Sequence, residues 1–476
     1  MDNEELKVLK VYSQNKETDL EFSGTVKLSE LLEANGLMPA TPCGGNGTCG
    51  KCSAYFNGKK ILCCQARLDE GGELYLPEKK ILNKIKTDGD MPEFTIKEQD
   101  GYGLAVDIGT TTVVARIIDL KTGALLPAVS RENPQRLLSA DVIGRIQASI
   151  EKGKLPVLEG LIKETVQDLK EHALKLNGLT DADIRKTVIT GNTTMLYLYT
   201  GRMPTTLAYT PFIADCLFGY EEDGIYYPPC FGAFVGADIY TAIVASGLIP
   251  KDETALLVDL GTNGEIALYD KGKLTCCATA CGPAFEGTGI SCGGHAADGA
   301  IDHVWIKDGK PKFSVIGNTE PTHICGSGIM DAIATLLDLE VIDETGAMPE
   351  PYEFAPGVVL QPKDVRQVQL AKAAICGGIK TLINREGLTE EDIKTLYIAG
   401  GFGSYITLDS AVRVGVFPKE LQDNAKVIGN AALSGAIMIL LGAEKKFEPA
   451  SVETECINLA QQPEFSDLYM ESMFFE

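Results

Sequence analysis

Apolar and polar residues at the N-terminus follow the periods of short strands and one helix. Residues 6–12, LKVLKVY, alternate and predict a strand, and ELYLP at 73–77 predicts a strand that closes the sheet. Residues 28–36, LSELLEANG, have their leucines on one helical face and a glycine at the end, which predicts a short helix. KCSAYF and KKILCC flank Asn57-Gly58, which is the strongest short signal for a β-hairpin.

Beyond residue 100 one apolar pattern occurs twice. Residues 102–125 and 255–274 each predict a buried strand, an Asp-x-Gly-Thr turn and a second strand. Residues 179–195 and 388–404 each predict a helix start capped by Thr, a buried strand and a glycine turn. An amphipathic helical pattern precedes each copy of this second pair, at 161–178 and 370–387. A repeat that keeps this order predicts two halves with the same α/β fold.

The segment between these two parts, residues 81–100, has no sustained periodicity. It is charged and is interrupted by Gly89 and Pro92. Such a segment is either a tether or an ordered connector between a small domain at 1–80 and a large one at 101–476. A tether would suit a redox domain that must move between an electron donor and an acceptor.

The composition restricts the classes of function. The 476 residues include 43 Lys and Arg against 66 Asp and Glu, a formal net charge of −23. No nucleic-acid partner is expected, because binding a phosphate backbone needs a basic surface. The acidic N-terminus lacks a secretory signal and no apolar run reaches the length of a membrane span, so we expect a cytoplasmic protein without a membrane partner. The 14 cysteines then predict reduced thiols in an anaerobic cytoplasm.

The strongest candidate for metal chemistry is the run PCGGNGTCGKC, which places Cys43, Cys49 and Cys52 in one glycine-rich loop. The predicted hairpin then returns an adjacent pair, Cys63 and Cys64. Four thiolates can hold a [2Fe–2S] cluster, and the glycines let the backbone approach it closely. Successive strand residues point to opposite faces, so only one of the adjacent pair can be the fourth ligand.

Zinc, a disulfide and a phosphate loop are the alternatives for this run. Zinc sites usually pair two short knuckles, whereas here three cysteines share one loop, which favours the iron–sulfur interpretation. The run also fits G-x4-G-K from Gly45 to Lys51. A phosphate loop would have Ser or Thr next and an apolar strand before it, and neither is present.

The two Asp-x-Gly-Thr turns are candidate phosphate-binding hairpins. Each places a carboxylate, Asp107 or Asp259, at the end of a buried strand. Backbone N–H groups beside the glycine and the threonine hydroxyls can donate to ATP phosphates, and the carboxylates would orient Mg²⁺ through water. A turn-capping aspartate would explain one such turn, but two copies in duplicated halves favour a nucleotide site. The residues expected at the phosphates are Gly109, Thr110, Thr111, Thr112, Gly261, Thr262 and Asn263.

This duplicated order resembles the actin, sugar-kinase and Hsp70 ATPase family over residues 101–476. The resemblance implies two lobes that face each other across a nucleotide cleft. It makes GADI and NAALSGA the two connecting helices, and Asp238 in GADI a candidate for positioning the attacking water. Helix capping is the alternative role for this aspartate. The resemblance makes GGFGS the adenosine motif, with Gly400, Gly401 and Gly403.

A glycine-rich stretch and four cysteines in the second half offer further candidate residues. Glu286 lies in a glycine-rich stretch and is a candidate to approach the phosphates. His295, in the same stretch, is expected to be a solvated loop histidine. Four further cysteines lack the two spaced knuckles of a metal site and predict small buried side chains: Cys276, Cys277, Cys281 and Cys292.

The cysteine loop and the duplicated ATPase halves together resemble the reductive activators of corrinoid-dependent methyltransferases. The resemblance implies a β-grasp [2Fe–2S] ferredoxin-like domain joined to an actin-like ATPase domain. It implies that the fourth ligand is Cys64, because the ligand directly precedes Gln in that family, as here at Gln65. It also implies an enzyme that uses ATP and Mg²⁺ to reduce inactive Co(II) corrinoid to Co(I). The expected partners are a corrinoid protein, a low-potential electron donor and a second copy of the chain in a homodimer.

Three other functions are alternatives. An ATP-driven electron donor to another low-potential metalloenzyme, such as a radical dehydratase, would use the same two parts. A redox-sensing or nucleotide-sensing module would bind nucleotide without turnover. A small-molecule kinase would leave the cysteine loop unexplained.

Overall fold

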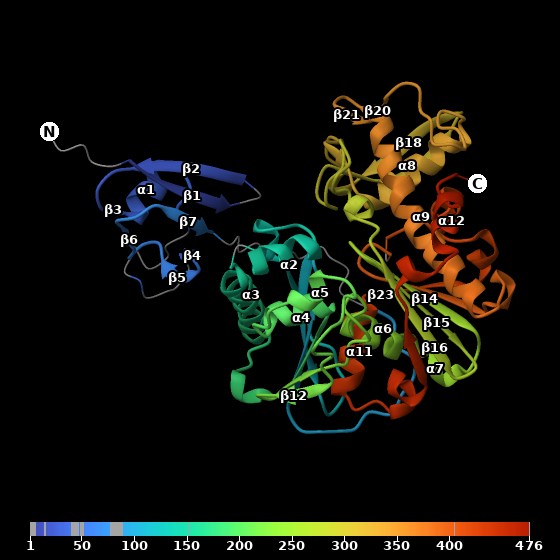
Figure 1. The fold of residues 1–476 in the computed structure, drawn as a ribbon, viewed down its shortest axis with the longest axis horizontal. Coiled ribbons are helices and arrows are strands. Elements are labelled where there is room, and N and C mark those ends of the chain that lie inside the picture. Colours follow the sequence, from blue (N-terminus) through green and yellow to red (C-terminus); the bar gives the residue numbers. More distant parts are fainter. Residues whose placement is uncertain are drawn as a thin grey trace.

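The computed structural model describes residues 6–13, 16–39, 47, 52–76, 89–151, 153–403 and 405–475. A small N-terminal domain lies to one side of a large domain that is built from two lobes (Figure 1). The three parts follow one another along the chain, except that each lobe's segment of chain contributes one helix that packs on the sheet of the other lobe.

The N-terminal domain is a five-stranded sheet packed against one helix. The strand order is β2-β1-β7-β4-β5, with β1 parallel to β7 and antiparallel to β2. The predicted strands, helix and hairpin are confirmed, and the hairpin turn at Asn57 and Gly58 has positive φ at both residues. The elements are β1 Lys7–Ser13, β2 Lys16–Phe22, β3 Val26–Lys27, α1 Leu28–Ala34, β4 Ser53–Phe56, β5 Lys59–Leu62, β6 Arg67–Leu68 and β7 Gly72–Tyr75.

The large domain repeats one sheet topology. In the first lobe the order is β10-β9-β8-β11-β13-β12, with β8 antiparallel to β9 and parallel to β11. In the second lobe the order is β23-β22-β14-β15-β16-β24, with β14 antiparallel to β15 and parallel to β22. The predicted duplication is therefore confirmed at the level of strand order and direction.

The strands of the two large sheets have the following bounds. In the first lobe they are β8 Tyr102–Ile108, β9 Thr112–Asp119, β10 Val129–Glu132, β11 Ile184–Gly191, β12 Tyr220–Glu222 and β13 Ile225–Tyr227. In the second lobe they are β14 Ala255–Leu260, β15 Gly264–Asp270, β16 Lys273–Thr279, β22 Thr395–Ala399, β23 Ala425–Gly429 and β24 Glu453–Cys456.

The two predicted amphipathic helices begin earlier than their periodicity indicated. They are α3 Leu155–Leu176 and α9 Pro362–Arg385, and each has a proline in its first turn. Proline is compatible with the first turn because the N–H groups there have no intrahelical acceptor. The Thr-capped starts that follow, at Thr180 and Thr389, form capping boxes on single 3₁₀ turns rather than on longer helices.

Two helices cross between the lobes. α6 Ala237–Ser246 packs against the second sheet, whereas α11 Ala431–Leu440 packs against the first, and the two helices contact each other. These are the predicted connecting helices. Each one packs on the sheet of the other lobe, so together they join the two lobes.

The second lobe carries an additional layer, which lies at the top right in Figure 1. It consists of β17 Ala300–Lys307, β18 Lys310–Val315, β19 His323–Ile324, α8 Gly326–Asp338, β20 Tyr352–Ala355, β21 Val358–Leu360 and α10 Leu408–Val414. The remaining helices are α2 Val142–Glu151, α4 Thr193–Tyr199, α5 Thr205–Ala208, α7 Leu248–Lys251 and α12 Phe465–Glu471.

The segment predicted as a tether or connector is ordered over residues 89–100. Asp90 N donates to Ile428 O at 3.0 Å, and Lys97 N donates to Leu441 O at 2.8 Å. Apolar side chains of the same segment pack against α11. Over this part the segment is a connector rather than a tether, and the rest of it lies outside the described residues.

The N-terminal domain contacts the first lobe along α3. Tyr55 and Tyr75 form a buried cluster with side chains of α3. Ser53 Oγ donates to Glu164 Oε1 at 2.7 Å, and Lys60 Nζ lies 3.4 Å from the other oxygen of the same carboxylate. The face that docks on the large domain is therefore formed by β4, β5 and β7.

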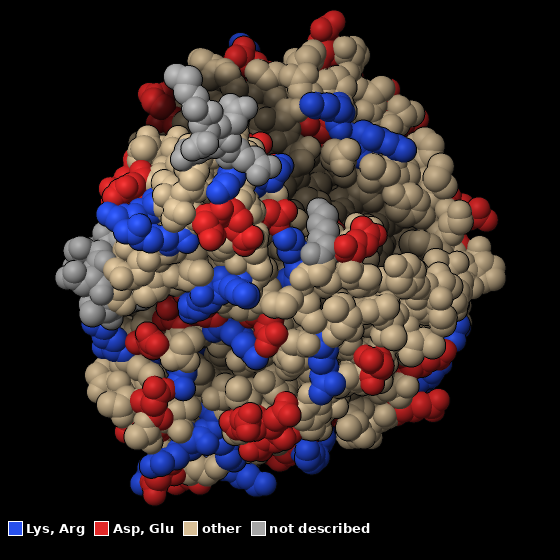
Figure 2. Space-filling model, turned by 60° about the vertical axis from the view of Figure 1, so that its left-hand side comes forward, with Lys and Arg blue, Asp and Glu red and all other residues tan. Residues whose placement is uncertain are grey.

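Charge is mixed on the surface drawn in Figure 2, where Lys and Arg alternate with Asp and Glu. The net charge of −23 is thus not gathered into one patch on this face. Among the helices that the structure describes, none combines the length and apolar character needed to cross a membrane.

Candidate functional site

The two described cysteines of the predicted cluster lie together. Cys52 Sγ and Cys64 Sγ are 3.2 Å apart. Cys63 instead points into the core of the N-terminal domain, and burial there raises its pKa to about 12. Cys43 and Cys49 lie outside the described residues. The described geometry is the one expected if Cys64, rather than Cys63, completes the ligand set.

This thiol pair fits an iron–sulfur group. The two sulfurs come from different segments, the end of the cysteine loop and the turn after β5. Burial raises the pKa of Cys52, and a bound metal would offset that effect because a coordinating thiol loses its proton. In the described part of the chain no three His, Cys, Asp or Glu side chains gather as a metal site. A complete set here would also need Cys43 and Cys49.

The first predicted phosphate hairpin, between β8 and β9, is anchored from behind by polar side chains. Asn133 Nδ2 donates to Gly109 O at 2.9 Å, and Arg145 Nη2 donates to Thr110 O at 2.7 Å. Asn133 N also donates to Thr111 O at 2.7 Å. In a trans peptide the N–H points opposite to the C=O. The N–H groups that follow these carbonyls are therefore directed away from the anchors, as a phosphate site requires.

The second phosphate hairpin, between β14 and β15, is anchored by a thiol. Gly261 N donates to Asn263 O at 3.1 Å and closes the turn. Cys281 Sγ lies 3.3 Å from Gly261 O and 3.4 Å from Thr262 O. The carbonyls again face backwards, so this turn directs N–H groups away from Cys281.

The two hairpins approach each other through threonine side chains. Thr111 Oγ1 and Thr262 Oγ1 are 3.3 Å apart. Both hydroxyls donate to Glu286, one to each carboxylate oxygen, at 2.8 Å. The structure thus brings the two predicted hairpins together and places an acid between them.

Three predicted carboxylates form an acidic cluster with Glu265, which the sequence analysis missed. Burial raises the pKa of Asp107 to about 6, although Asn430 Nδ2 donates to its Oδ2 at 3.1 Å and opposes the shift. Burial, and then the charge of Asp107, raise the pKa of Asp259 to about 7. Burial, and then the charges of Asp259 and Asp107, raise the pKa of Asp238 to about 8. Burial also raises the pKa of Glu265 well above its usual value.

Such a group of carboxylates disfavours its own full ionisation, and a divalent cation nearby would reverse that effect. Oxygen donors are also the ligands that Mg²⁺ prefers. Asp238 lies in the first turn of α6 and accepts from Ile239 N at 2.9 Å, whereas the N-cap position is Gly236, so Asp238 is not the capping residue.

The glycine turn after β22 lies against the second hairpin. Gly400 N donates to Gly429 O at 3.0 Å, and a Cβ on Gly400 would lie 2.6 Å from Asp259 Oδ1. Phe402 of the same turn stacks on Phe285 with ring centroids 5.4 Å apart. The predicted adenosine motif, which also includes Gly401 and Gly403, therefore borders the second hairpin through Gly400.

The histidine and the cysteines considered in the second lobe lie where an exposed loop residue and small buried side chains are expected. His295 is exposed, and its Nε2 lies 3.7 Å from Glu132 Oε1 of the first lobe. The four cysteines of the second lobe are buried small side chains, as predicted: Cys276, Cys277, Cys281 and Cys292. Only Cys281 contacts one of the predicted hairpin turns within the described residues.

Several residues of the site escaped the sequence analysis. Arg145 is fully buried in α2, and its signal was an arginine on the apolar face of a helix. Asn133 precedes a proline, which indicates a turn but not a partner. Glu265 had a usable signal, because the first copy of the repeat has Val113 at the corresponding strand position.

Family models match both halves of the large domain. The model described as the RACo middle region matches residues 102–251, which is the first lobe. The model described as the C-terminal domain of RACo, the ASKHA domain, matches residues 253–476, which is the second lobe. The large domain therefore has the actin-like ATPase fold that the repeat predicted.

Whole-chain comparisons agree. The corrinoid activation enzyme RamQ of Eubacterium limosum is 30% identical over 96% of this chain and 98% of that protein. A Co(II) methylated amine-specific corrinoid protein reductase of Methanosarcina barkeri is 26% identical over 71% of this chain and 70% of that protein. The solved structure of a reductive activator for a corrinoid, iron–sulfur protein is similar with a TM-score of 0.70. It is 25% identical, and the match covers 98% of each chain.

Proposed function

This chain belongs to the family of reductive activators of corrinoid proteins, and from that premise we propose that it uses ATP to reduce the Co(II) corrinoid of a partner protein to Co(I). The cobalt gains one electron, which an external low-potential donor supplies through a [2Fe–2S] cluster in the N-terminal domain. The observation that carries the proposal is that one chain holds both a converging thiol pair and two facing phosphate hairpins.

Four cysteines would hold the cluster: Cys43, Cys49, Cys52 and Cys64. The 3.2 Å approach of the last two sulfurs supports this set. The β2-β1-β7-β4-β5 sheet with its parallel central pair supports a β-grasp, ferredoxin-like domain. When bound, the cluster would supply electrons singly at a potential near −400 mV, which is typical of plant-type ferredoxins.

The large domain would hold ATP between the hairpins. The turns at Gly109–Thr112 and Gly261–Asn263 would donate N–H and hydroxyl groups to the phosphates, and Asp107 and Asp259 would orient the waters of Mg²⁺. Asp238 would accept a proton from the attacking water once a divalent cation favours its charged form, because burial and the neighbouring carboxylates otherwise raise its pKa to about 8 and keep it protonated near neutral pH. The adenosine would lie against Gly400, Gly401 and Gly403.

ATP has a clear physical purpose in such a protein. When the acceptor potential lies below that of the donor, each ~59 mV of difference costs about a factor of ten in a one-electron equilibrium. Binding and hydrolysis of ATP can offset this difference if closure of the lobes changes how the chain holds the corrinoid protein. The N-terminal domain docks on α3 of the first lobe, so lobe movement would also reposition the thiol pair.

A reconstituted assay tests the proposal. Anaerobically prepared protein is mixed with a Co(II) corrinoid protein, a low-potential reductant and MgATP, and the absorption of Co(I) is followed. We expect Co(I) to form only when ATP is present. Absence of ATP-dependent Co(I) would contradict the proposal, and absence of ATP turnover with the partner present would favour a sensing module.

A matched pair of variants tests the ligand set. Cys64→Ser should lose the [2Fe–2S] spectrum and the reduction of cobalt, because the position that faces Cys52 no longer offers a thiolate. Cys63→Ser changes the neighbouring thiol in the same way and should keep both. The reverse result would assign the fourth ligand to Cys63. A [4Fe–4S] spectrum in the wild type would instead favour a donor to another class of metalloenzyme.

A further inference from the structure

Glu286 connects the two hairpins of the proposed nucleotide site. It ends a four-residue 3₁₀ turn, Pro283–Glu286, which follows the strand β16. Its two carboxylate oxygens accept from Thr111 Oγ1 of the first lobe and Thr262 Oγ1 of the second, each at 2.8 Å. One side chain therefore bridges the two lobes at the point where their hairpins meet.

A threonine hydroxyl has a single proton to donate. While Thr111 and Thr262 donate to Glu286, neither can donate to a phosphate oxygen. A phosphate placed between the hairpins would also meet the negative charge of the carboxylate at short range. Glu286 and a nucleotide phosphate therefore compete for the same two donors.

The turn that carries Glu286 is bounded by two glycines in the left-handed region. It lies between Gly282 and Gly287, whose φ angles of 72° and 79° are open to glycine and costly for other residues. Directly before it, Cys281 contacts the carbonyls of the second hairpin. Two glycines with positive φ thus flank a short turn next to the proposed phosphate site.

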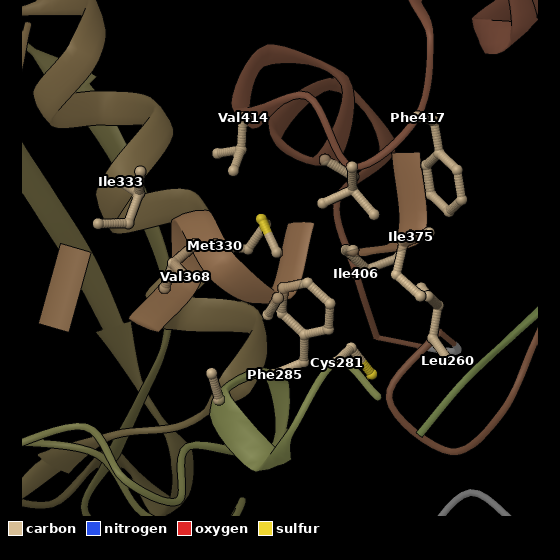
Figure 3. Close-up of a cluster of buried hydrophobic side chains, with 14 of the residues drawn as sticks. Leu260, Cys281, Phe285, Met330, Ile333, Val368, Ile375, Ile406, Val414 and Phe417 are labelled. Atoms are coloured by element: carbon tan, nitrogen blue, oxygen red, sulfur yellow. The ribbon is translucent and has the colours of Figure 1, made fainter. Parts of the chain in front are cut away.

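The neighbouring side chain anchors the same turn in the second lobe. Phe285 is 1% exposed, and Figure 3 shows it among Met330, Val368 and Ile406 of the large apolar cluster. It also stacks on Phe402 of the adenosine motif, with the ring planes 4° apart. The backbone of Phe285 lies against the first residue of α8, where a Cβ on Gly326 would come 1.8 Å from Phe285 O.

We infer that Glu286 is an inter-lobe latch that nucleotide phosphate displaces, an inference that rests on the proposed nucleotide site. In the latched state its carboxylate joins Thr111 to Thr262 and holds the hairpins together. Phosphate takes over both hydroxyls and Glu286 moves out, which shifts Phe285 against Phe402 and α8. The latch thereby sets the affinity for nucleotide and reports occupancy of the phosphate site to the second lobe.

Titration calorimetry on the full-length protein with MgADP and AMP tests the latch. Glu286→Ala should bind ADP about tenfold more tightly than wild type, because two charge-assisted hydrogen bonds no longer have to be exchanged. Its affinity for AMP should be unchanged, since AMP lacks the phosphates that reach the hairpins. Glu286→Gln retains one carbonyl acceptor and should show an intermediate gain. Glu350→Ala, at an exposed glutamate of the same lobe, is the matched control and should match wild type.

Thermal unfolding gives a second measurement on the same variants. Without nucleotide, Glu286→Ala should unfold at a lower temperature than wild type, because the bridge between the lobes is lost. The rise in unfolding temperature on adding ADP should be larger than in wild type. Equal or weaker ADP binding by Glu286→Ala, in a wild type that does bind ADP, would overturn the latch alone. A wild type that binds no ADP would overturn the proposed nucleotide site and the latch with it.

Discussion

The two phosphate hairpins share a sequence pattern but differ in what holds them. The first is anchored by Asn133 and by the fully buried Arg145, which donate to three consecutive carbonyls of the turn. The second is anchored by Cys281, whose thiol is a weak donor. We therefore expect the first hairpin to be held more firmly than the second, which lies next to the turn of Glu286.

The equivalent carboxylates of the two copies, Asp107 and Asp259, also differ in what stabilises their charged form. Asp107 accepts from Asn430 at the start of α11, and this bond stabilises its charged form. Asp259 instead receives the like charge of Asp107, which disfavours its charged form, and Asp238 in the first turn of α6 adds its carboxylate to the same cluster.

The largest expected effect comes from the anchor of the first hairpin. Arg145→Met keeps the volume but leaves the carbonyl oxygens of Thr110 and Ser139 without their donors. Each unsatisfied buried carbonyl costs about 1–3 kcal/mol, so we expect a loss of roughly 4 kcal/mol in the free energy of unfolding. Denaturant unfolding measures this loss, and ADP affinity should fall by at least about a hundredfold. Arg145→Lys should recover part of both, since one donor can still be offered.

An intermediate effect is expected from the acidic cluster. Asp238 has its pKa raised to about 8, from an ordinary 3.8. Between these values the folded state binds more protons than the unfolded state, so the free energy of unfolding falls as the pH rises. Asp238→Asn removes the contribution of this carboxyl to the pH dependence. The fall in the free energy of unfolding with rising pH should then be smaller by about 1.4 kcal/mol per pH unit near neutrality.

The control for this pH prediction is Asp223→Asn, at an exposed aspartate of the first lobe. It should leave the pH dependence of unfolding unchanged. Saturating MgADP should lessen the dependence in wild type, because the cation compensates the acids. An identical pH slope in Asp238→Asn and wild type would show that this carboxylate keeps its ordinary pKa.

The smallest effect is expected at the anchor of the second hairpin. Cys281→Ala removes a thiol that contacts Gly261 O and Thr262 O, and the net loss should stay below about 1 kcal/mol. ADP affinity should change by less than about threefold. Unfolding and calorimetry on Cys281→Ala and Arg145→Met side by side give the comparison directly. Equal losses in the two variants would mean that the hairpins are held equally firmly.

The sequence predicted the elements well wherever the information was local. The two strand-turn-strand units, the Asn57-Gly58 hairpin and the buried helix at α11 follow from residues that lie next to one another. Spacing also indicated Asp107 and Asp259 as the ends of equivalent strands. The starts of α3 and α9 were placed too late, because first-turn prolines break the apolar period without ending the helix.

By itself, then, the sequence determined the duplicated fold and the paired hairpins, because side-chain direction along a strand or helix is set by neighbours. Only the tertiary structure decided that Arg145 and Asn133 hold the first turn, that Asn430 supports Asp107, and that Glu286 joins Thr111 to Thr262. These partners are separated by 22 to 323 positions along the chain, as at Asn133 to Thr111 and Asn430 to Asp107. Hydrogen bonds across such separations depend on how the packed lobes bring distant segments together, which no local pattern of residues records.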